Sequence, residues 1–188
     1  MKELDEDVIN REEQLASLCT RGDESALKEL YTKYATRIIV LCSRYVHDEE
    51  SAKDLMHDTM LKAFVSIGRF RYKGEGSLYA WLRGIAIKTA VDKYRSQRLE
   101  NSPLLFDLVD DSSWPVRDEI RAVPMKVLRE MISTLPSTQK IIFNMFCLDG
   151  CSHKEIANYL GITEKASSSL LSKAKKTLGR RIKKYLER

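Results

Sequence analysis

The chain has 188 residues, of which 43% are hydrophobic and 31% are charged, and its formal net charge is +5. This length suits one ordinary domain or two small ones, and it excludes a large multidomain enzyme. No apolar run reaches the roughly 18 residues that a membrane span needs, and the start, MKELDEDVINREEQ, lacks the apolar core of a secretory signal. We therefore expect a cytoplasmic protein without membrane insertion.

Charge and proline content divide the chain into blocks. Residues 62–98 carry nine basic and two acidic side chains, residues 131–188 carry 11 and 4, and residues 99–130 between them are net acidic. Two basic blocks indicate two polyanion-binding surfaces, with solvated helix faces as the alternative. All four prolines lie between 103 and 136. We predict a helical extension at 1–22, a helical domain at 23–98, a flexible linker at 99–130 and a second helical domain at 131–188.

The N-terminal block has apolar residues three and four positions apart, the spacing of amphipathic helices. A short helix is expected around residues 8–19, one after an Asp23 N-cap, one after an Asp48 N-cap, and a long one from Ser77 to about Arg98. No alternating strand pattern competes with this interpretation. The predicted fold class is all-α.

The C-terminal block contains a predicted helix-turn-helix. Pro136 opens a helix that ends near Gly150, and Ser152 with Glu155 has the spacing of a capping box. Gly161 permits a sharp turn, and Thr163 can cap the basic helix that follows. Such a helix fits the major groove of DNA, although the same geometry also occurs in bundles that bind no DNA.

The segment 64–98 combines aromatic and basic residues. Its loop, Phe70-Arg71-Tyr72-Lys73-Gly74-Glu75-Gly76, places aromatic side chains where a core role is harder to assign. Aromatic rings stack on unpaired bases while Lys and Arg follow the phosphates, so this segment is a candidate for single-strand contact. Packing in the core is the alternative, above all for Trp81.

Short motifs follow one another in a specific order along both blocks. In the N-terminal block they are Asp54-Leu55-Met56-His57-Asp58, the Phe70–Gly74 segment, Trp81-Leu82-Arg83-Gly84-Ile85-Ala86 and Asp92-Lys93-Tyr94-Arg95. In the C-terminal block they are Leu135-Pro136, Ser152–Ala157, Leu160-Gly161-Ile162 and Lys173-Ala174-Lys175. Each motif is weak alone, but the ordered set resembles bacterial RNA polymerase sigma factors of the extracytoplasmic-function (ECF) group.

The resemblance implies a transcription initiation factor that forms and breaks no bond itself. Core RNA polymerase is expected to dock on Asp54, His57, Asp58 and Leu61, which recur at helical spacing on one face. The melted −10 non-template strand is expected at Phe70, Arg71, Tyr72, Lys73, Tyr79, Trp81, Arg83, Lys88, Lys93 and Arg95. The −35 duplex is expected at Ser152, Thr163, Glu164, Lys165, Ser167, Ser168, Lys173, Lys175 and Lys176.

The same resemblance implies an anti-sigma factor as a further partner and a monomeric state when free. The linker, with Asp107, Asp110 and Asp111, is expected to follow the RNA exit path. Two departures from the family pattern stand out. His57 occupies a position where relatives often have glutamine, and Ala166-Ser167-Ser168-Ser169-Leu170 occupies a stretch where many place Lys or Arg. Bidentate arginine readout of guanine is therefore not expected there.

Other functions fit less of the chain. Asp54, His57 and Asp58 resemble the ligands of a metal-dependent phosphohydrolase, but only two further histidines exist to complete such a site. Cys147, Cys151 and His153 lack a fourth zinc ligand nearby, and Cys147 is expected to be a buried thiol. No cofactor, metal or enzymatic activity is predicted. A stand-alone helix-turn-helix regulator is the alternative, but it leaves the Asp54 face unexplained, and a helical adaptor leaves both basic blocks unexplained.

Overall fold

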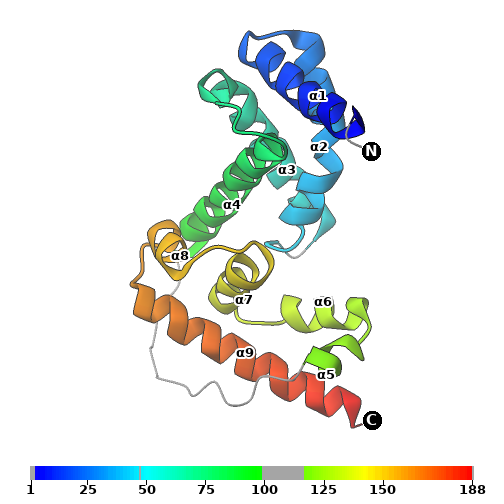
Figure 1. The fold of residues 1–188 in the computed structure, drawn as a ribbon. Helices are drawn as coiled ribbons and strands as arrows, with labels where there is room; N and C mark the ends of the chain where they lie inside the picture. Colours follow the sequence, from blue (N-terminus) through cyan, green and yellow to red (C-terminus); the bar gives the residue numbers. More distant parts are fainter. Residues whose placement is uncertain (1–2, 47, 99–116, 188) are drawn as a thin grey trace. The chain divides into compact units, whose positions relative to one another are not determined.

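The computed structural model describes residues 3–46, 48–98 and 117–187, and the side chains within 11–46, 48–96 and 118–187. These residues form helices and no strands, which confirms the predicted all-α class (Figure 1). The chain divides into two compact units, Met1–Lys93 and Tyr94–Arg188, and each is described by itself. None of the described helices is both long enough and apolar enough to cross a membrane.

The first unit is built from three α-helices and most of a fourth. They are α1 (Glu3–Thr20), α2 (Glu24–Cys42), α3 (Glu49–Ser66) and α4 (Ser77–Arg98), with a 3₁₀ turn at Ile67–Arg69 after α3; the last residues of α4, from Tyr94, belong to the second unit. Helix α2 packs against both α1 and α3. The fully buried side chains of the unit are large and aliphatic: Leu30, Ile38, Leu41, Leu55, Met60, Leu78, Leu82 and Ile87. Burial of this apolar surface is the main force that holds the unit together.

Local side chains set the starts of two of these helices, as predicted. The Asp23 carboxylate accepts the Ala26 N–H at 2.8 Å, and the Asp48 carboxylate accepts the Ser51 N–H at 2.7 Å. Each bond satisfies a backbone donor that has no partner within its helix, and each places negative charge at the positive end of the helix dipole.

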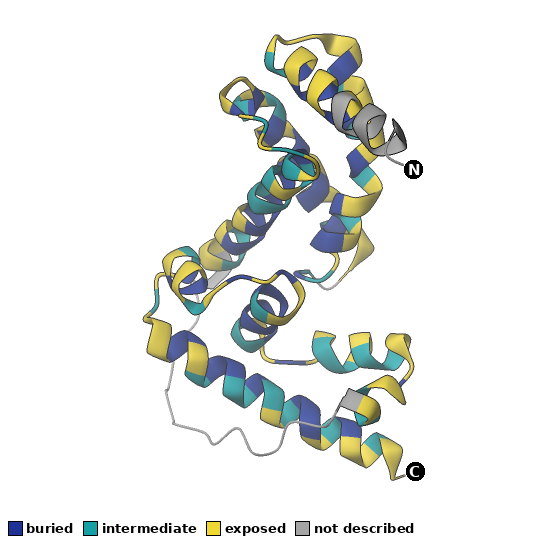
Figure 2. Ribbon diagram, viewed as in Figure 1, coloured by how far each residue is buried: buried dark blue, intermediate teal, exposed yellow. Residues whose placement is uncertain are grey.

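The second unit is organised around its longest helix, α9 (Glu164–Leu186). Four shorter helices pack against it: α5 (Arg117–Arg121), α6 (Met125–Ser133), α7 (Ser137–Phe143) and α8 (His153–Leu160). A π-helical stretch, Asn144–Leu148, follows α7. Figure 2 shows buried positions recurring along α9, and this stripe includes Leu170, Leu171, Ala174, Leu178 and Ile182.

The predicted end of the linker at residue 130 is wrong. Helices α5 and α6 already begin at Arg117 and Met125, and Val123 between them is buried. Pro124 precedes the first residue of α6, a position where proline starts a helix at little cost, so the proline marks a helix start and not a linker. The rest of the predicted linker, 99–116, lies outside the described residues, as do Asp107, Asp110 and Asp111.

Candidate nucleic-acid interface

Helix α3 presents to solvent a face that combines polar and aliphatic side chains. Asp54, His57, Asp58 and Leu61 are all exposed on it, as their helical spacing predicts. Val65, which the sequence analysis did not select, extends the same stripe by one more turn. Leu61 and Val65 are 62% and 90% exposed, an unusual state for two aliphatic side chains on one face. We call these five residues the α3 face.

The loop of residues 70–76, between the 3₁₀ turn and α4, is fixed at its first residue. Phe70 is only 6% exposed, and its ring lies 5.2 Å from the ring of Trp81 on α4. In this structure the Phe70 ring is therefore not exposed for contact with a base. Its apolar ring is removed from water by packing on Trp81, which is itself half-buried.

The two tyrosines selected for this region also make contacts within the unit. The guanidinium of Arg37 lies 3.7 Å from the centre of the Tyr79 ring, and the Tyr34 ring stacks at 6.2 Å on the same side chain. Tyr72 is half-buried, and burial followed by the charges of Glu12 and Glu13 raises the pKa of its hydroxyl. Arg71 and Lys73 are exposed and are the loop's two cationic side chains, and the Arg71 guanidinium also donates to the Phe70 carbonyl at 3.0 Å.

The start of α4 depends on a residue far away in the sequence. Glu12 on α1 is 7% exposed, and its carboxylate accepts the N–H of Gly76 at 3.0 Å and the N–H of Leu78 at 2.9 Å. Gly76 precedes the helix with a φ of +78°, a conformation suited to glycine, and glycine has no side chain with which to cap. Sequence reasoning missed Glu12 because no local spacing signals a cap 64 residues away.

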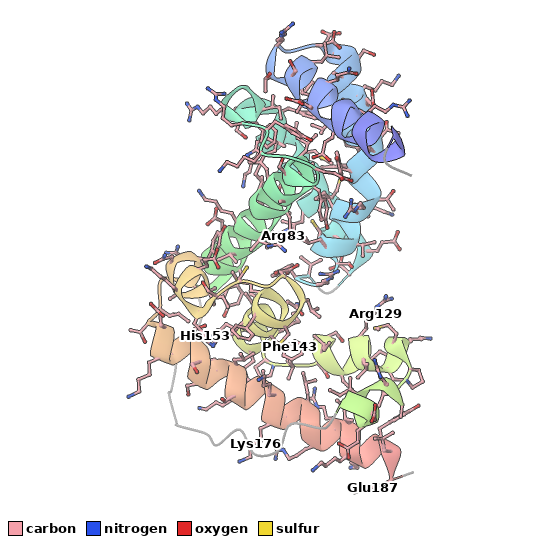
Figure 3. The ribbon with its side chains drawn as sticks, viewed as in Figure 1. Arg83, Arg129, Phe143, His153, Lys176 and Glu187 are labelled. Atoms are coloured by element: carbon pink, nitrogen blue, oxygen red, sulfur yellow. The ribbon has the colours of Figure 1, made fainter. Side chains whose placement is uncertain are left out.

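The four basic residues predicted on α4 do not form one surface. Lys88 and Arg95 are exposed and, seven residues apart, lie on the same side of the helix. Arg83, labelled in Figure 3, and Lys93 are half-buried and lie on other sides. Only Lys88 and Arg95 therefore share an exposed side of α4 from which cations can follow a phosphate backbone.

The helix-turn-helix of the second unit forms as predicted. The Ser152 hydroxyl accepts the Glu155 N–H at 3.2 Å, and the Glu155 carboxylate accepts the Ser152 N–H at 2.7 Å, which completes the capping box. Gly161 ends α8 with a φ of +66°, and the Thr163 hydroxyl accepts the Ala166 N–H at 3.1 Å. Ser152 and Thr163 therefore use their hydroxyls to set helix starts.

Ser167, one of the residues predicted to contact DNA, is not exposed in this structure. Ser167 is fully buried, and its hydroxyl lies 2.9 Å from Nδ1 of His153 on α8. The His153 ring also stacks on Phe146 with 4.6 Å between ring centres (Figure 3 labels His153 between α8 and α9). Burial lowers the pKa of His153 against the opposing effect of Glu164, so the neutral ring is favoured. Ser167 therefore joins the two helices of the motif.

An exposed basic stripe runs along α9. Helical spacing places its members on one side, and they are Lys165, Ser168, Lys176, Arg180 and Lys183. We call these five residues the α9 stripe; Figure 3 labels Lys176 on the side of α9 turned away from α7. Glu164 is exposed beside it, whereas Lys173 and Lys175 are half-buried at its flanks. Arg181 is used elsewhere, since its guanidinium donates to the Met131 carbonyl at 2.7 Å and so fastens the end of α6.

Comparison with known proteins decides the family. The family Sigma-70 region 2 matches residues 30–100, and Sigma-70, region 4 matches residues 125–178. The ECF RNA polymerase sigma-E factor of Escherichia coli K12 is 23% identical over 183 residues, which cover 89% of this chain and 92% of that protein. The chain is an ECF-type sigma factor. It is also 28% identical over 165 residues to the RNA polymerase sigma-H factor of Pseudomonas aeruginosa, covering 80% of this chain and 82% of that one.

Solved structures agree with the fold of this sigma factor. CnrH in complex with the cytosolic domain of CnrY matches with a TM-score of 0.51 at 19% identity, covering 90% of this chain and 96% of that chain. The sigma factor RpoE in complex with the anti-sigma factor NepR from Bartonella quintana matches with a TM-score of 0.53 at 16% identity, covering 84% of this chain and 96% of that chain. Family membership makes core RNA polymerase and promoter DNA its partners, and the two matched regions correspond to its two helical units.

The cysteines of this sigma factor differ from expectation at one position. Cys147 is exposed, whereas Cys151, four residues later, is buried, as are Cys19 and Cys42. The π-helical stretch at Asn144–Leu148 has more residues per turn than an α-helix, so it rotates Cys147 away from the stripe that Phe143 begins. Burial raises the pKa of Cys42 to about 12, which keeps that thiol protonated. Among the described side chains, no three His, Cys, Asp or Glu residues lie close enough together to hold a metal ion.

Proposed function

We propose that this sigma factor binds core RNA polymerase through the α3 face, reads the −35 element as duplex DNA with α9, and holds the melted −10 non-template strand beside the 70–76 loop. It supplies recognition and strand capture and carries out no catalysis. Since its work is on RNA polymerase, we place it in the cytoplasm.

The α3 face carries the first part of this proposal. It combines two exposed aliphatic side chains, Leu61 and Val65, with the carboxylates of Asp54 and Asp58 on one side of a rigid helix. Leu61 and Val65, 62% and 90% exposed and one helical turn apart, form a small apolar patch beside two carboxylates, and a protein partner can cover such a patch. A stand-alone regulator does not require this face.

The −35 contact is supported by the α9 stripe on the second helix of a helix-turn-helix. The N-terminal part of α9 offers Lys165 and Ser168 of the stripe, with Glu164 beside them, for contact with base edges or the DNA backbone. Lys176 follows about two helical turns after Ser168. The lysines supply phosphate contacts that position the helix. Ser167 is left out of this surface because it faces His153.

The −10 contact is supported by exposed cations in the 70–76 loop and on α4. Arg71 and Lys73 lie in the loop itself, and Lys88 and Arg95 share an exposed side of α4. Trp81 is half-buried, with its ring tilted against that of Phe70, and its exposed part is the surface on which a base would stack. We further propose that an anti-sigma factor binds this protein by covering these surfaces, and that the free protein is a monomer.

The experiment measures opening of the promoter DNA by holoenzyme that contains either the wild-type protein or the Trp81→Ala variant. On a promoter that the wild-type holoenzyme transcribes, permanganate reactivity reports unpaired thymines of the −10 region, and DNase protection reports the −35 duplex. We expect Trp81→Ala to lower permanganate reactivity severalfold while protection of the −35 duplex persists. Unchanged reactivity for the variant would remove Trp81 from strand capture. Absence of opening by the wild type would overturn the proposed function.

A further inference from the structure

The 70–76 loop is attached at both ends, and the attachment at its second end comes from a residue far away in the sequence. At the first end, Phe70 packs on Trp81, and its N–H donates to the Ile67 carbonyl at 2.9 Å. At the other end, the Gly76 N–H donates to the carboxylate of Glu12. Between these ends, Arg71, Lys73 and Glu75 are exposed. The loop therefore exposes its charged side chains between two ends that are held by buried residues, Phe70 at the first end and Glu12 at the second.

The attachment through Glu12 replaces a local helix cap. Helices α2, α3, α8 and α9 each begin after a side chain that accepts a backbone N–H of the first turn. Helix α4 begins after Gly76, and its first turn, Ser77-Leu78-Tyr79-Ala80, contains no acidic residue. The Glu12 carboxylate accepts two of the backbone donors there and places a negative charge at the positive end of the helix dipole.

Helix α1 contacts the approach to the loop as well as its end. Helix α1 packs against the 3₁₀ turn that leads into the loop, and Glu12 on α1 holds Gly76 and Leu78 at the other end. Burial is the main cause that raises the pKa of Tyr72 in the loop, and the charges of Glu12 and its exposed neighbour Glu13 add to it. Helix α1 is therefore the element that supports both ends of the loop (α1 and α4 in Figure 1).

We propose that Glu12 is a positioning residue for −10 recognition: its carboxylate fixes Gly76 and the first turn of α4 so that the 70–76 loop keeps the shape that accepts the −10 strand. This proposal rests on the proposed function and extends it to a residue outside the −10 surface. Preorganisation of this kind lowers the entropy that the loop loses when it binds, and so acts on −10 binding and base discrimination.

The experiment compares Glu12→Gln and Glu12→Ala with the matched control Glu13→Gln. The control removes a neighbouring carboxylate charge near Tyr72 but none of the hydrogen bonds described for α4. Amide hydrogen exchange on the free full-length protein reports the attachment directly. We expect exchange at Gly76 and Leu78 to be about tenfold faster in both Glu12 variants and unchanged in the control.

The functional readout uses holoenzyme and a fork-junction DNA, in which a −35 duplex is joined to a single-stranded −10 segment of a promoter that the wild-type holoenzyme transcribes. We expect the Glu12 variants to lose about fivefold in discrimination between this segment and one with a single base replaced, with affinities for core polymerase and for the −35 duplex retained. Glu13→Gln should behave as wild type.

Three results overturn the proposal. Wild-type discrimination in both Glu12 variants would show that the loop's shape does not depend on the attachment. Equal losses in core binding, −35 binding and −10 binding would show that Glu12 serves general stability alone. A wild-type holoenzyme that shows no base preference in the −10 segment would overturn the proposed function itself, which separates that failure from a failure of the Glu12 proposal.

Discussion

At the scale of single residues, two adjacent serines on α9 differ completely in environment. Ser167 is buried and bonded to Nδ1 of His153, whereas Ser168 is exposed on the α9 stripe. A helix rotates by about 100° per residue, so Ser167 can point into the interior while its neighbour Ser168 points to solvent. The sequence identified a serine-rich stretch at the right place on the recognition helix, but which serine faces inward depends on how α8 packs.

This difference predicts that one of two small substitutions lowers stability and the other lowers affinity for DNA. Ser167→Ala removes the bond to His153 and leaves a partly buried ring nitrogen without that partner, so we expect a loss of about 1 kcal/mol in the free energy of unfolding. Ser168→Ala should change stability by less than about 0.5 kcal/mol and reduce affinity for the −35 duplex instead. Urea unfolding of the full-length variants measures the first effect, and equal midpoints for the two variants would contradict it.

At the scale of elements, the α3 face predicts a defect in polymerase binding without loss of fold. Asp58→Ala and Leu61→Ala each change an exposed side chain of α3, so the free energy of unfolding should stay within about 0.5 kcal/mol of wild type. Affinity for core polymerase should fall about tenfold in each, as for central interface residues. Glu29→Ala, an exposed carboxylate on α2, is the control. Competition binding with labelled protein measures the affinities, and wild-type values for both variants would remove this face from the interface.

Helix α9 predicts a change in the salt dependence of DNA binding. Each lysine that neutralises a phosphate releases counterions, so Lys165→Ala and Lys176→Ala should each lower the slope of log affinity against log salt by up to about 1 for the −35 duplex. The loss of affinity should be similar for different DNA sequences. Lys126→Ala removes an equal charge from an exposed residue of α6 that is not part of the α9 stripe, and it should leave the slope unchanged. Unchanged slopes in both α9 variants would contradict phosphate contact by this stripe.

Local sequence signals predicted most element boundaries, and nonlocal contacts account for the misses. Asp23, Asp48 and Ser152 act on residues three positions away, so spacing alone reveals them. Glu12 acts 64 and 66 positions away, and no spacing rule covers such a cap. The burial of Phe70 follows from a ring on another helix for the same reason. In the candidate site, exposed helix faces were predictable and intramolecular partners were not.

At the scale of the whole molecule, two helical units carry two separate kinds of surface. The first unit bears the α3 face and the 70–76 loop, and the second bears the α9 stripe. The proline-rich composition between the basic blocks predicted this division, but it placed the linker's end too late because α5 and α6 are short helices held by α9 and, at α6, by Arg181. Each surface is modest alone, so recognition of a promoter is expected to need both surfaces together on the polymerase.

The most direct test of the central claim is transcription from genomic DNA fragments by core polymerase with and without this protein, after co-elution of the two on size exclusion. We predict a stable complex, together with run-off transcripts that appear only when the protein is present and start at promoters sharing −35 and −10 sequences. Failure to co-elute, with tight duplex binding by the protein alone as a dimer, would contradict a sigma factor and identify a stand-alone regulator.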